Sequence, residues 1–140
     1  MEIKRYIREL PPSAMEIRVT VFVDEQGFYD EFDDIDAIST HFVMFDDDGS
    51  PIATCRVFEK DVPGEYYLGR LAVMKAHRGQ GRGAQIVAEA ENYLREIGAL
   101  SLALHSQCSA EGFYLRCGYT PFGDIEDEQG CPHIWMKKVL

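Results

Sequence analysis

Residues 75–83 read Lys-Ala-His-Arg-Gly-Gln-Gly-Arg-Gly, and this stretch decides the fold. Three of its last five residues are glycines, which permit a tight turn and leave backbone amides uncovered. A strand-like apolar run, 66–73, precedes the stretch. Apolar residues at helical spacing follow it, namely Ile86, Val87, Ala90, Tyr93, Leu94 and Ile97. Because a helix N-terminus carries partial positive charge, the stretch predicts a cradle for a pyrophosphate.

The charge around this stretch also favours an anion site. Between Leu68 and Ala88 the chain carries four Lys and Arg residues and no Asp or Glu. A Walker phosphate loop is excluded, because no Gly-Lys-Ser/Thr follows the glycines. A dinucleotide-binding fold would place its glycines near the start of an alternating βαβ series, so this second class does not fit either.

The remaining pattern predicts a mixed α/β domain with one central sheet. Ser13 and Glu16 predict a capping box that opens a helix over 13–25. Apolar spacing indicates a short second helix or turn in the acidic segment that follows, and Ser109 can cap another helix that runs through Cys117. Strands are expected at 2–7, 41–45, 52–58, 66–73, 100–104, 118–124 and 133–139.

The composition indicates one globular domain. The chain has 140 residues, of which 46% are hydrophobic, and this is enough for one packed core. No apolar run approaches membrane-spanning length and no apolar leader opens the chain, so we expect a cytoplasmic protein. The cysteines match no zinc-ligand or redox spacing, which favours reduced packing residues and no metal site: Cys55, Cys108, Cys117 and Cys131.

The net charge of −10 is concentrated in one segment. From Asp24 to Asp48 the chain holds ten Asp and Glu residues and no Lys or Arg, while the rest carries 14 charges of each sign. Such a field repels a polyphosphate backbone, so nucleic acid is a poor partner. The field attracts cationic small molecules or basic peptides, although a solvated acidic loop that aids solubility explains the charge as well.

These motifs resemble the GNAT superfamily of acetyl-coenzyme A dependent N-acetyltransferases. Its signature is a strand followed by Arg/Gln-x-x-Gly-x-Gly/Ala and a helix, and Arg78, Gly81 and Gly83 occupy those positions. Residues 110–119 are similar to the superfamily's helix with a Phe-Tyr pair before a Gly-aromatic turn. The ElaA-like and YjcF-like branch is the most similar, through residues 18–26, the acidic run that His41 follows, and residues 130–136.

The resemblance implies a fold and a cosubstrate. The fold is α/β (α+β), a single domain over 1–140 with a mixed, mostly antiparallel sheet of about six to seven strands and about four helices. The cosubstrate is acetyl-coenzyme A, whose pantetheine arm pairs with the backbone of Leu71, Ala72 and Val73. Its pyrophosphate is held by amides of the loop, from Arg78, Gly79, Gln80, Gly81, Arg82, Gly83 and Ala84. A non-catalytic domain that senses acyl-coenzyme A would use the same cradle and remains the alternative.

The resemblance also implies that an amine attacks the thioester directly, with Tyr114 placed to donate a hydrogen bond to the coenzyme sulfur. A primary amine must first lose a proton, which costs about 4 kcal/mol at neutral pH, so a base is useful. His133, in a Pro-His-Ile motif, is the favoured catalytic base. His41, Glu25 and the carboxylates of the acidic run are the other candidates.

The expected acceptor is a small-molecule or peptide amine of cationic character, with no nucleic acid or membrane as partner, and a homodimer stays open. The residues expected to bind it are Glu25, Glu31, Asp36, His41 and Arg70. Because Arg70 lies in an apolar strand, it needs a carboxylate partner, which the acidic run can supply, and a purely structural ion pair explains it equally well. His105 and Gln107 lie where the sheet should open toward the acyl group.

Overall fold

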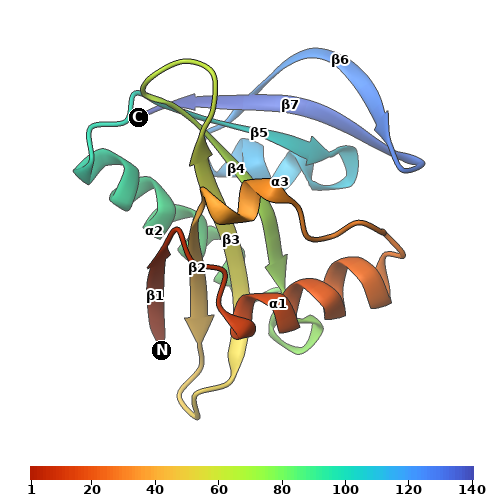
Figure 1. The fold of residues 1–140 in the computed structure, drawn as a ribbon. Helices are drawn as coiled ribbons and strands as arrows, with labels where there is room; N and C mark the ends of the chain where they lie inside the picture. Colours follow the sequence, from red (N-terminus) through yellow and green to blue (C-terminus); the bar gives the residue numbers. More distant parts are fainter.

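Seven strands form one sheet in the computed structural model, which describes residues 1–140 (Figure 1). Their order across the sheet is β1-β2-β3-β4-β5-β7-β6, and only the β4–β5 pair is parallel. The strands are β1 (Glu2–Ile7), β2 (Thr40–Phe45), β3 (Pro51–Glu59), β4 (Glu65–Val73), β5 (Ser101–Gln107), β6 (Thr120–Glu128) and β7 (Cys131–Val139). The predicted mixed, mostly antiparallel sheet is confirmed.

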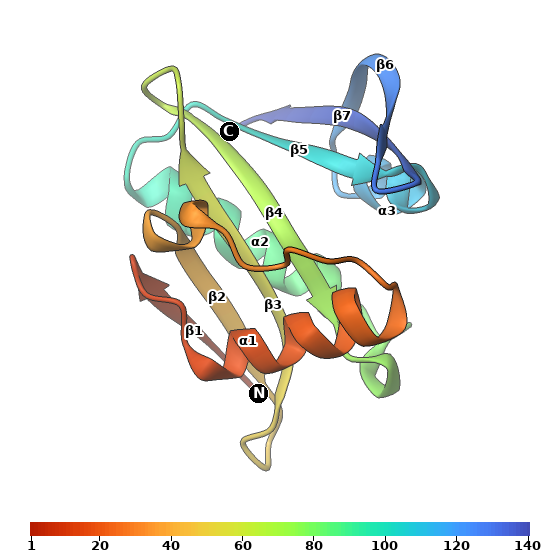
Figure 2. The ribbon, with the colours of Figure 1, turned by 45° about the vertical axis from the view of Figure 1, so that its right-hand side comes forward.

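Helices cover both faces of the sheet (Figure 2). They are α1 (Pro12–Arg18), which continues as a π-helix (Val19–Glu25), α2 (Arg82–Glu96) and α3 (Glu111–Arg116), with 3-10 turns at Asp34–Ala37, Lys75–His77 and Cys108–Ala110. Adjacent residues of a strand point to opposite faces, so Val43 of β2 packs with α1 while Phe42 and Met44 pack with α2. No helix is long and apolar enough to cross a membrane.

The first helix differs from its prediction. It begins at Pro12, whose fixed φ suits the first helical turn, and no side chain caps it, so the predicted capping box of Ser13 and Glu16 is wrong. The α-helix gives way to a π-helix at Val19, in a run rich in β-branched residues that have low helix propensity. A capping box is instead formed by Asp33 and Asp36.

Strands β4 and β5 are paired over only four residues each. The pairs run from Glu65 opposite Ser101 to Leu68 opposite Leu104, and beyond them the two strands separate. A bulge in β4 lies just past this point, where the register with β3 shifts and Arg70 has a φ of +54°. Because a bulge bends its strand, this irregularity explains why β4 leaves β5. The opening in the sheet therefore lies between two inner strands, β4 and β5, and not at an edge strand.

A buried ion network fastens the acidic segment across the sheet. Three arginines donate to three carboxylates in it: Arg18 to Glu31 and Asp36, Arg56 to Asp33 and Asp36, and Arg70 to Glu31. The five N–O distances lie between 2.7 and 2.9 Å. Arg18 is completely buried and Asp36 is 5% exposed. The prediction that Arg70 takes a carboxylate partner from the acidic run is confirmed.

This network should make the protein sensitive to acid. Burial by itself raises the pKa of Asp36, but hydrogen bonds from Arg18 and Arg56 outweigh it and lower the pKa from 3.8 to about 2. Since the pKa is lower in the folded than in the unfolded protein, protonation favours unfolding. Protonation of Asp36 should therefore lower the free energy of unfolding by about 2 kcal/mol as the pH falls from about 5 to 2.

Urea unfolding of the wild type and of Asp36→Asn across this pH range measures the effect. The variant should be less stable at pH 7 and should lose this part of the pH dependence. Asp61→Asn, at an exposed aspartate in a turn, is the control and should behave as the wild type. Equal pH dependence in Asp36→Asn and the wild type would contradict the assignment.

Candidate functional site

Two cavities adjoin where β4 and β5 separate. The loop cavity, of about 530 Å³, is lined by the glycine-rich loop and the end of β4. The splay cavity, of about 380 Å³, is lined by β4, β5, β7 and the segment after α1. Gln26, Leu71 and Phe113 line both cavities. One extended ligand can therefore lie in the loop cavity and present its end to the splay cavity.

The glycine-rich loop presents open backbone to the loop cavity. Gly79 and Gly81 have φ of +75° and +76°, a left-handed conformation that favours glycine, and a Cβ on either would project into open space. Gly81 is the N-cap of α2, so the first amides of that helix have no partner within it. A Cβ on Gly83 would come within 3.2 Å of the Phe113 ring, which shows how closely α2 approaches α3. This geometry suits a phosphate group.

Positive and titratable side chains surround the same cavity, namely His77, Arg78, Arg82 and Arg116. Arg78 is tied to its surroundings, because its Nε donates to the carbonyl oxygen of Val73 at 2.8 Å and its guanidinium pairs with Glu25 at 2.9 Å. Arg78 therefore joins the loop to the end of β4 and to the π-helix. Glu25 lies at the loop side of the site and not among the carboxylates of the ion network.

Nine of the ten residues predicted to hold the cosubstrate line the loop cavity: Leu71, Ala72, Val73, Arg78, Gly79, Gly81, Arg82, Gly83 and Ala84. The tenth, Gln80, is exposed and is not part of the lining. It lies between two glycines of positive φ, where the chain turns outward. The structure thus brings nine of these residues to one cavity, and that they hold the cosubstrate stays a prediction.

Tyr114, on α3, lines the splay cavity and is 7% exposed. Its ring packs edge-on against Phe113 and Tyr119. Its hydroxyl makes no hydrogen bond within the protein, unlike that of Tyr119, which donates to Glu91 at 2.7 Å. Burial raises the pKa of Tyr114 well above its usual range, so the hydroxyl keeps its proton. It is a hydrogen-bond donor available to a bound molecule.

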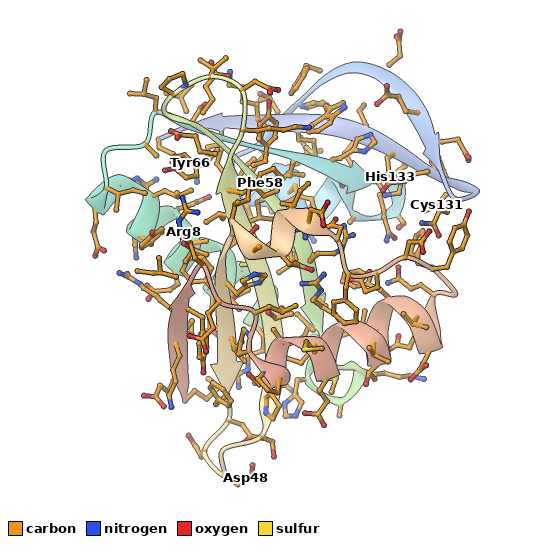
Figure 3. All side chains as sticks on the ribbon, viewed as in Figure 1. Arg8, Asp48, Phe58, Tyr66, Cys131 and His133 are labelled. Carbon is orange, nitrogen blue, oxygen red and sulfur yellow. The ribbon has the colours of Figure 1, made fainter.

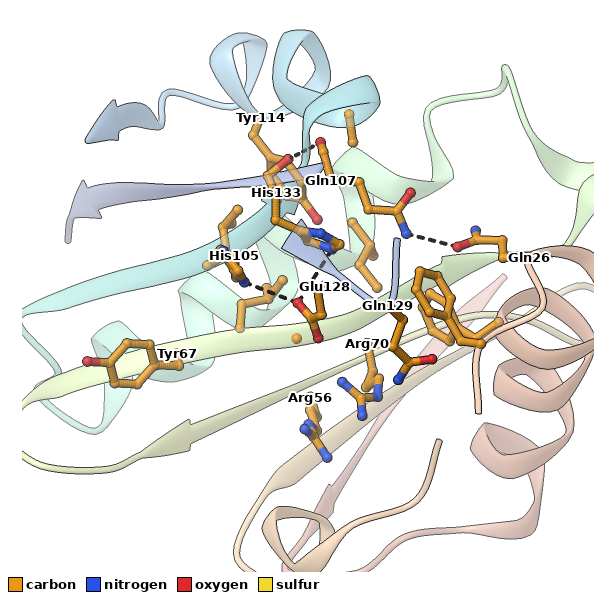
Figure 4. A pocket seen from close by; sticks show the side chains of 18 of the residues that line it. Gln26, Arg56, Tyr67, Arg70, His105, Gln107, Tyr114, Glu128, Gln129 and His133 are labelled. Carbon is orange, nitrogen blue, oxygen red and sulfur yellow. Dashed lines mark hydrogen bonds and ion pairs between the residues drawn. The ribbon is translucent and has the colours of Figure 1, made fainter. Parts of the chain in front are cut away.

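His133, on β7, faces the same cavity and is 6% exposed (Figures 3 and 4). Its Nδ1 lies 2.8 Å from the carbonyl oxygen of Cys131, which can only accept, so Nδ1 carries the proton of the neutral ring. Nε2 then holds the lone pair and lies 3.6 Å from Glu128, beyond hydrogen-bond distance. The neighbouring His105 ring is 4.9 Å away and also contacts Glu128, at 3.2 Å.

The predicted acceptor residues do not all gather at one place. Glu31 and Arg70 line the splay cavity, whereas Asp36 and His41 lie outside the lining of both cavities. His41 is 1% exposed, its Nε2 donates to the Asp36 carbonyl at 3.0 Å, and burial lowers its pKa. Arginines neutralise Glu31 and Asp36, which were predicted to bind a cationic acceptor, so neither carboxylate is free to attract one.

The sequence did not identify several residues that the fold brings to the splay cavity. Its lining includes the aromatic residues Phe28, Tyr29, Phe58, Tyr67 and Trp135, together with Glu128 and Gln129. They come from a loop, four strands and the β6–β7 turn, so no motif of fixed spacing unites them. The alternation of side chains along β4 and β7 indicates which residues share a face of the sheet. It does not show which of them lie side by side, because that depends on the strand register.

Two side-chain links cross the splay cavity. Gln129, in the β6–β7 turn, accepts from the backbone amide of Tyr29 at 3.0 Å and donates to its carbonyl at 3.1 Å. Gln107 at the end of β5 donates to Gln26 at 2.8 Å (Figure 4). These contacts join the segment after α1 to the far half of the sheet. The cavity is thus bounded on a side that the sheet itself leaves open.

Comparison with known proteins gives a consistent result. A family described as acetyltransferase (GNAT) domain matches residues 10–140. The UPF0039 protein sll0451 of Synechocystis sp. is 37% identical over 123 residues, which cover 86% of this chain and 80% of that protein.

Among solved structures, Escherichia coli ElaA is 25% identical with a TM-score of 0.87, covering 99% of both chains. An aminoglycoside 6'-N-acetyltransferase complexed with coenzyme A shares the fold, with a TM-score of 0.75 at 15% identity, covering 99% of this chain and 97% of that one.

Proposed function

Because the chain belongs to the GNAT acetyltransferase family, we propose that it moves an acetyl group from acetyl-coenzyme A to the nitrogen of a primary amine. The observation that carries this proposal is the junction of the two cavities at Leu71 and Phe113. An anion-binding loop lies on one side of the junction, and a free hydroxyl and an imidazole lie on the other. Acetyl transfer needs this juxtaposition, whereas coenzyme binding alone would need only the loop.

The loop cavity fits the coenzyme on grounds independent of family. Open backbone at Gly79 and Gly81 and the amides that begin α2 suit the pyrophosphate, and Arg82 and Arg116 supply positive charge. The end of β4 has no strand partner on its β5 side, so its backbone groups are available to the amides of the pantetheine arm. The bound coenzyme supplies the activated thioester.

In the proposed reaction the neutral amine attacks the thioester carbonyl directly. A carbon–nitrogen bond forms, the carbon–sulfur bond breaks, and sulfur leaves as a thiolate. The Tyr114 hydroxyl donates a hydrogen bond as charge develops on sulfur. Because a thiol has a pKa near 8.5 and burial raises the pKa of Tyr114, full proton transfer from the phenol is unfavourable. Tyr114 therefore assists by hydrogen bonding.

We assign the base to His133. Its Nε2 lone pair faces the splay cavity, and the hydrogen bond from Nδ1 to Cys131 holds the ring in that tautomer. Glu128, 3.6 Å from Nε2, stabilises the ring once it has taken the proton of the amine. Arg56 and Arg70 face the same cavity, but their charges are committed to Glu31, Asp33 and Asp36.

Incubation with acetyl-coenzyme A and a panel of primary amines, followed by mass spectrometry and by release of free thiol, tests the proposal. A product heavier by one acetyl group, formed with one thiol per product, supports it. Saturable coenzyme binding with no product from any amine would instead indicate a domain that only senses acyl-coenzyme A.

The coenzyme cradle can be tested at Gly81. Acetyl-coenzyme A at about 100 times its Kd should stabilise the protein by about 3 kcal/mol, a rise in Tm on the order of 10 °C. Gly81→Val places a side chain where the backbone meets the ligand and should abolish the shift. Gly98→Val is the matched control, because Gly98 has a similar φ of +81° and open surroundings at the other end of α2. An unchanged shift in Gly81→Val would show that the cradle lies elsewhere.

Tyr114→Phe should lower kcat by about ten- to a hundredfold and leave coenzyme affinity unchanged, because the lost hydrogen bond matters only as sulfur gains charge. The fold should tolerate the change, since the hydroxyl has no partner within the protein. Tyr119→Phe gives the opposite pattern as a control: it loses a buried hydrogen bond to Glu91, so stability falls and kcat does not. Steady-state kinetics and thermal unfolding of both variants decide the matter.

His133→Gln should lower kcat by about a hundredfold, as expected for the loss of a general base. Glutamine keeps a side-chain donor for the Cys131 carbonyl but has no basic nitrogen. His41→Gln, outside the lining of both cavities and with a side-chain donor kept for the Asp36 carbonyl, should leave kcat within about twofold. Equal kcat values for His133→Gln and the wild type would exclude His133 as the base.

A further inference from the structure

Three aromatic rings form a continuous wall at one end of the splay cavity, and we call Phe58, Tyr67 and Trp135 the aromatic wall. Phe58 and Tyr67 are stacked with ring centroids 5.6 Å apart, and Tyr67 meets Trp135 edge-on at 5.9 Å. The rings come from β3, β4 and β7. Figure 4 shows Tyr67 at the end of the cavity away from Tyr114, with His133 between them.

Core packing does not account for the aromatic wall. None of its three residues belongs to either buried hydrophobic cluster or is among the half-buried residues packed against one. All three are half-buried and line the cavity. Soluble proteins seldom leave several adjacent aromatic rings partly uncovered in a concave site unless a ligand covers them. The wall therefore presents apolar ring surface to whatever enters, and His105 extends it by stacking on Trp135 with ring centroids 4.6 Å apart.

The charges in the splay cavity leave one carboxylate for a ligand. Glu31 is held by Arg18 and Arg70, so it has little to offer a cation. Glu128 contacts only the rings of His105 and His133 and is half exposed. No Lys or Arg side chain pairs with Glu128, in contrast to Glu31. The cavity thus combines a single anionic group with a flat apolar wall.

We propose that the acceptor is a primary amine carried on a small aromatic ring, with its nitrogen beside Glu128 and His133 and its ring against Tyr67 and Trp135. This inference rests on the proposed acetyl transfer and specifies its acceptor. The splay cavity, of about 380 Å³, lies at the small end of the range of volumes found for ligand pockets, which suits a small ring. A polyamine would need a second free carboxylate, and the lining of this cavity has none.

Two probe amines of similar length distinguish these acceptors. The value of kcat/KM for 2-phenylethylamine should exceed that for 1,5-diaminopentane by at least about tenfold, since two aromatic contacts favour the ring. Trp135→Leu and Tyr67→Leu should each reduce this ratio about threefold or more. Phe122→Leu is the matched control, because Phe122 neighbours Trp135 but does not line the cavity. Equal values for the two amines, or a ratio that neither wall variant alters, would overturn the proposal.

Binding can be followed without any acetyl transfer. Trp135 is the single tryptophan of the chain, so its fluorescence reports on the aromatic wall directly. Titration with 2-phenylethylamine should change the fluorescence saturably, and Glu128→Gln should weaken that binding about tenfold. Saturable binding without acetylation of any amine would support the acceptor site while rejecting the proposed transfer. A fluorescence signal that does not respond to 2-phenylethylamine but saturates with 1,5-diaminopentane would reject the site.

Discussion

The rest of the site depends on the buried network of three arginines and three carboxylates. Burying Arg18, Arg56, Glu31 and Asp36 is costly, and the network offsets this cost because each buried carboxylate accepts short charge-assisted hydrogen bonds from two arginines. Asp36 is shared by Arg18 and Arg56 at 2.8 and 2.7 Å, and Glu31 by Arg18 and Arg70 at 2.8 and 2.9 Å. These shared groups join α1, the segment after it, β3 and β4 into one unit.

Two consequences for the site follow from this unit. Arg70 lies in the bulge of β4, so its ion pair holds the strand at the place where it leaves β5 and opens the sheet. The segment after α1 is held above this opening, where Tyr29 reaches Gln129 and Gln26 reaches Gln107. The acidic segment therefore acts mainly through structure, since its carboxylates hold one wall of the splay cavity in place.

The loop cavity and the splay cavity differ in the charged side chains that line them. The loop cavity keeps its positive character, because Arg82 and Arg116 face it without close acidic partners. In the splay cavity the arginines are paired with carboxylates, and Glu128 lies beside two imidazoles with no arginine partner. The two adjoining spaces thus differ in charge, and the proposed acetyl transfer would use this difference. Acetyl transfer from a coenzyme needs an anion site and an amine site next to each other. Neither cavity by itself would favour acetyl transfer over simple binding.

The sequence alone determined the family, the order of the elements and the loop cavity, because these rest on local patterns. Glycines of positive φ, the strand before them and the amphipathic helix after them lie within one stretch, 66–97. Short motifs also singled out Tyr114 and His133, which both line the splay cavity, and their roles remain proposals. Which charges are free and which rings meet follow instead from contacts between distant parts of the chain. The partners of Asp36, and the meeting of Tyr67 with Trp135, depend on strand register and on a bulge that joins residues distant in the chain.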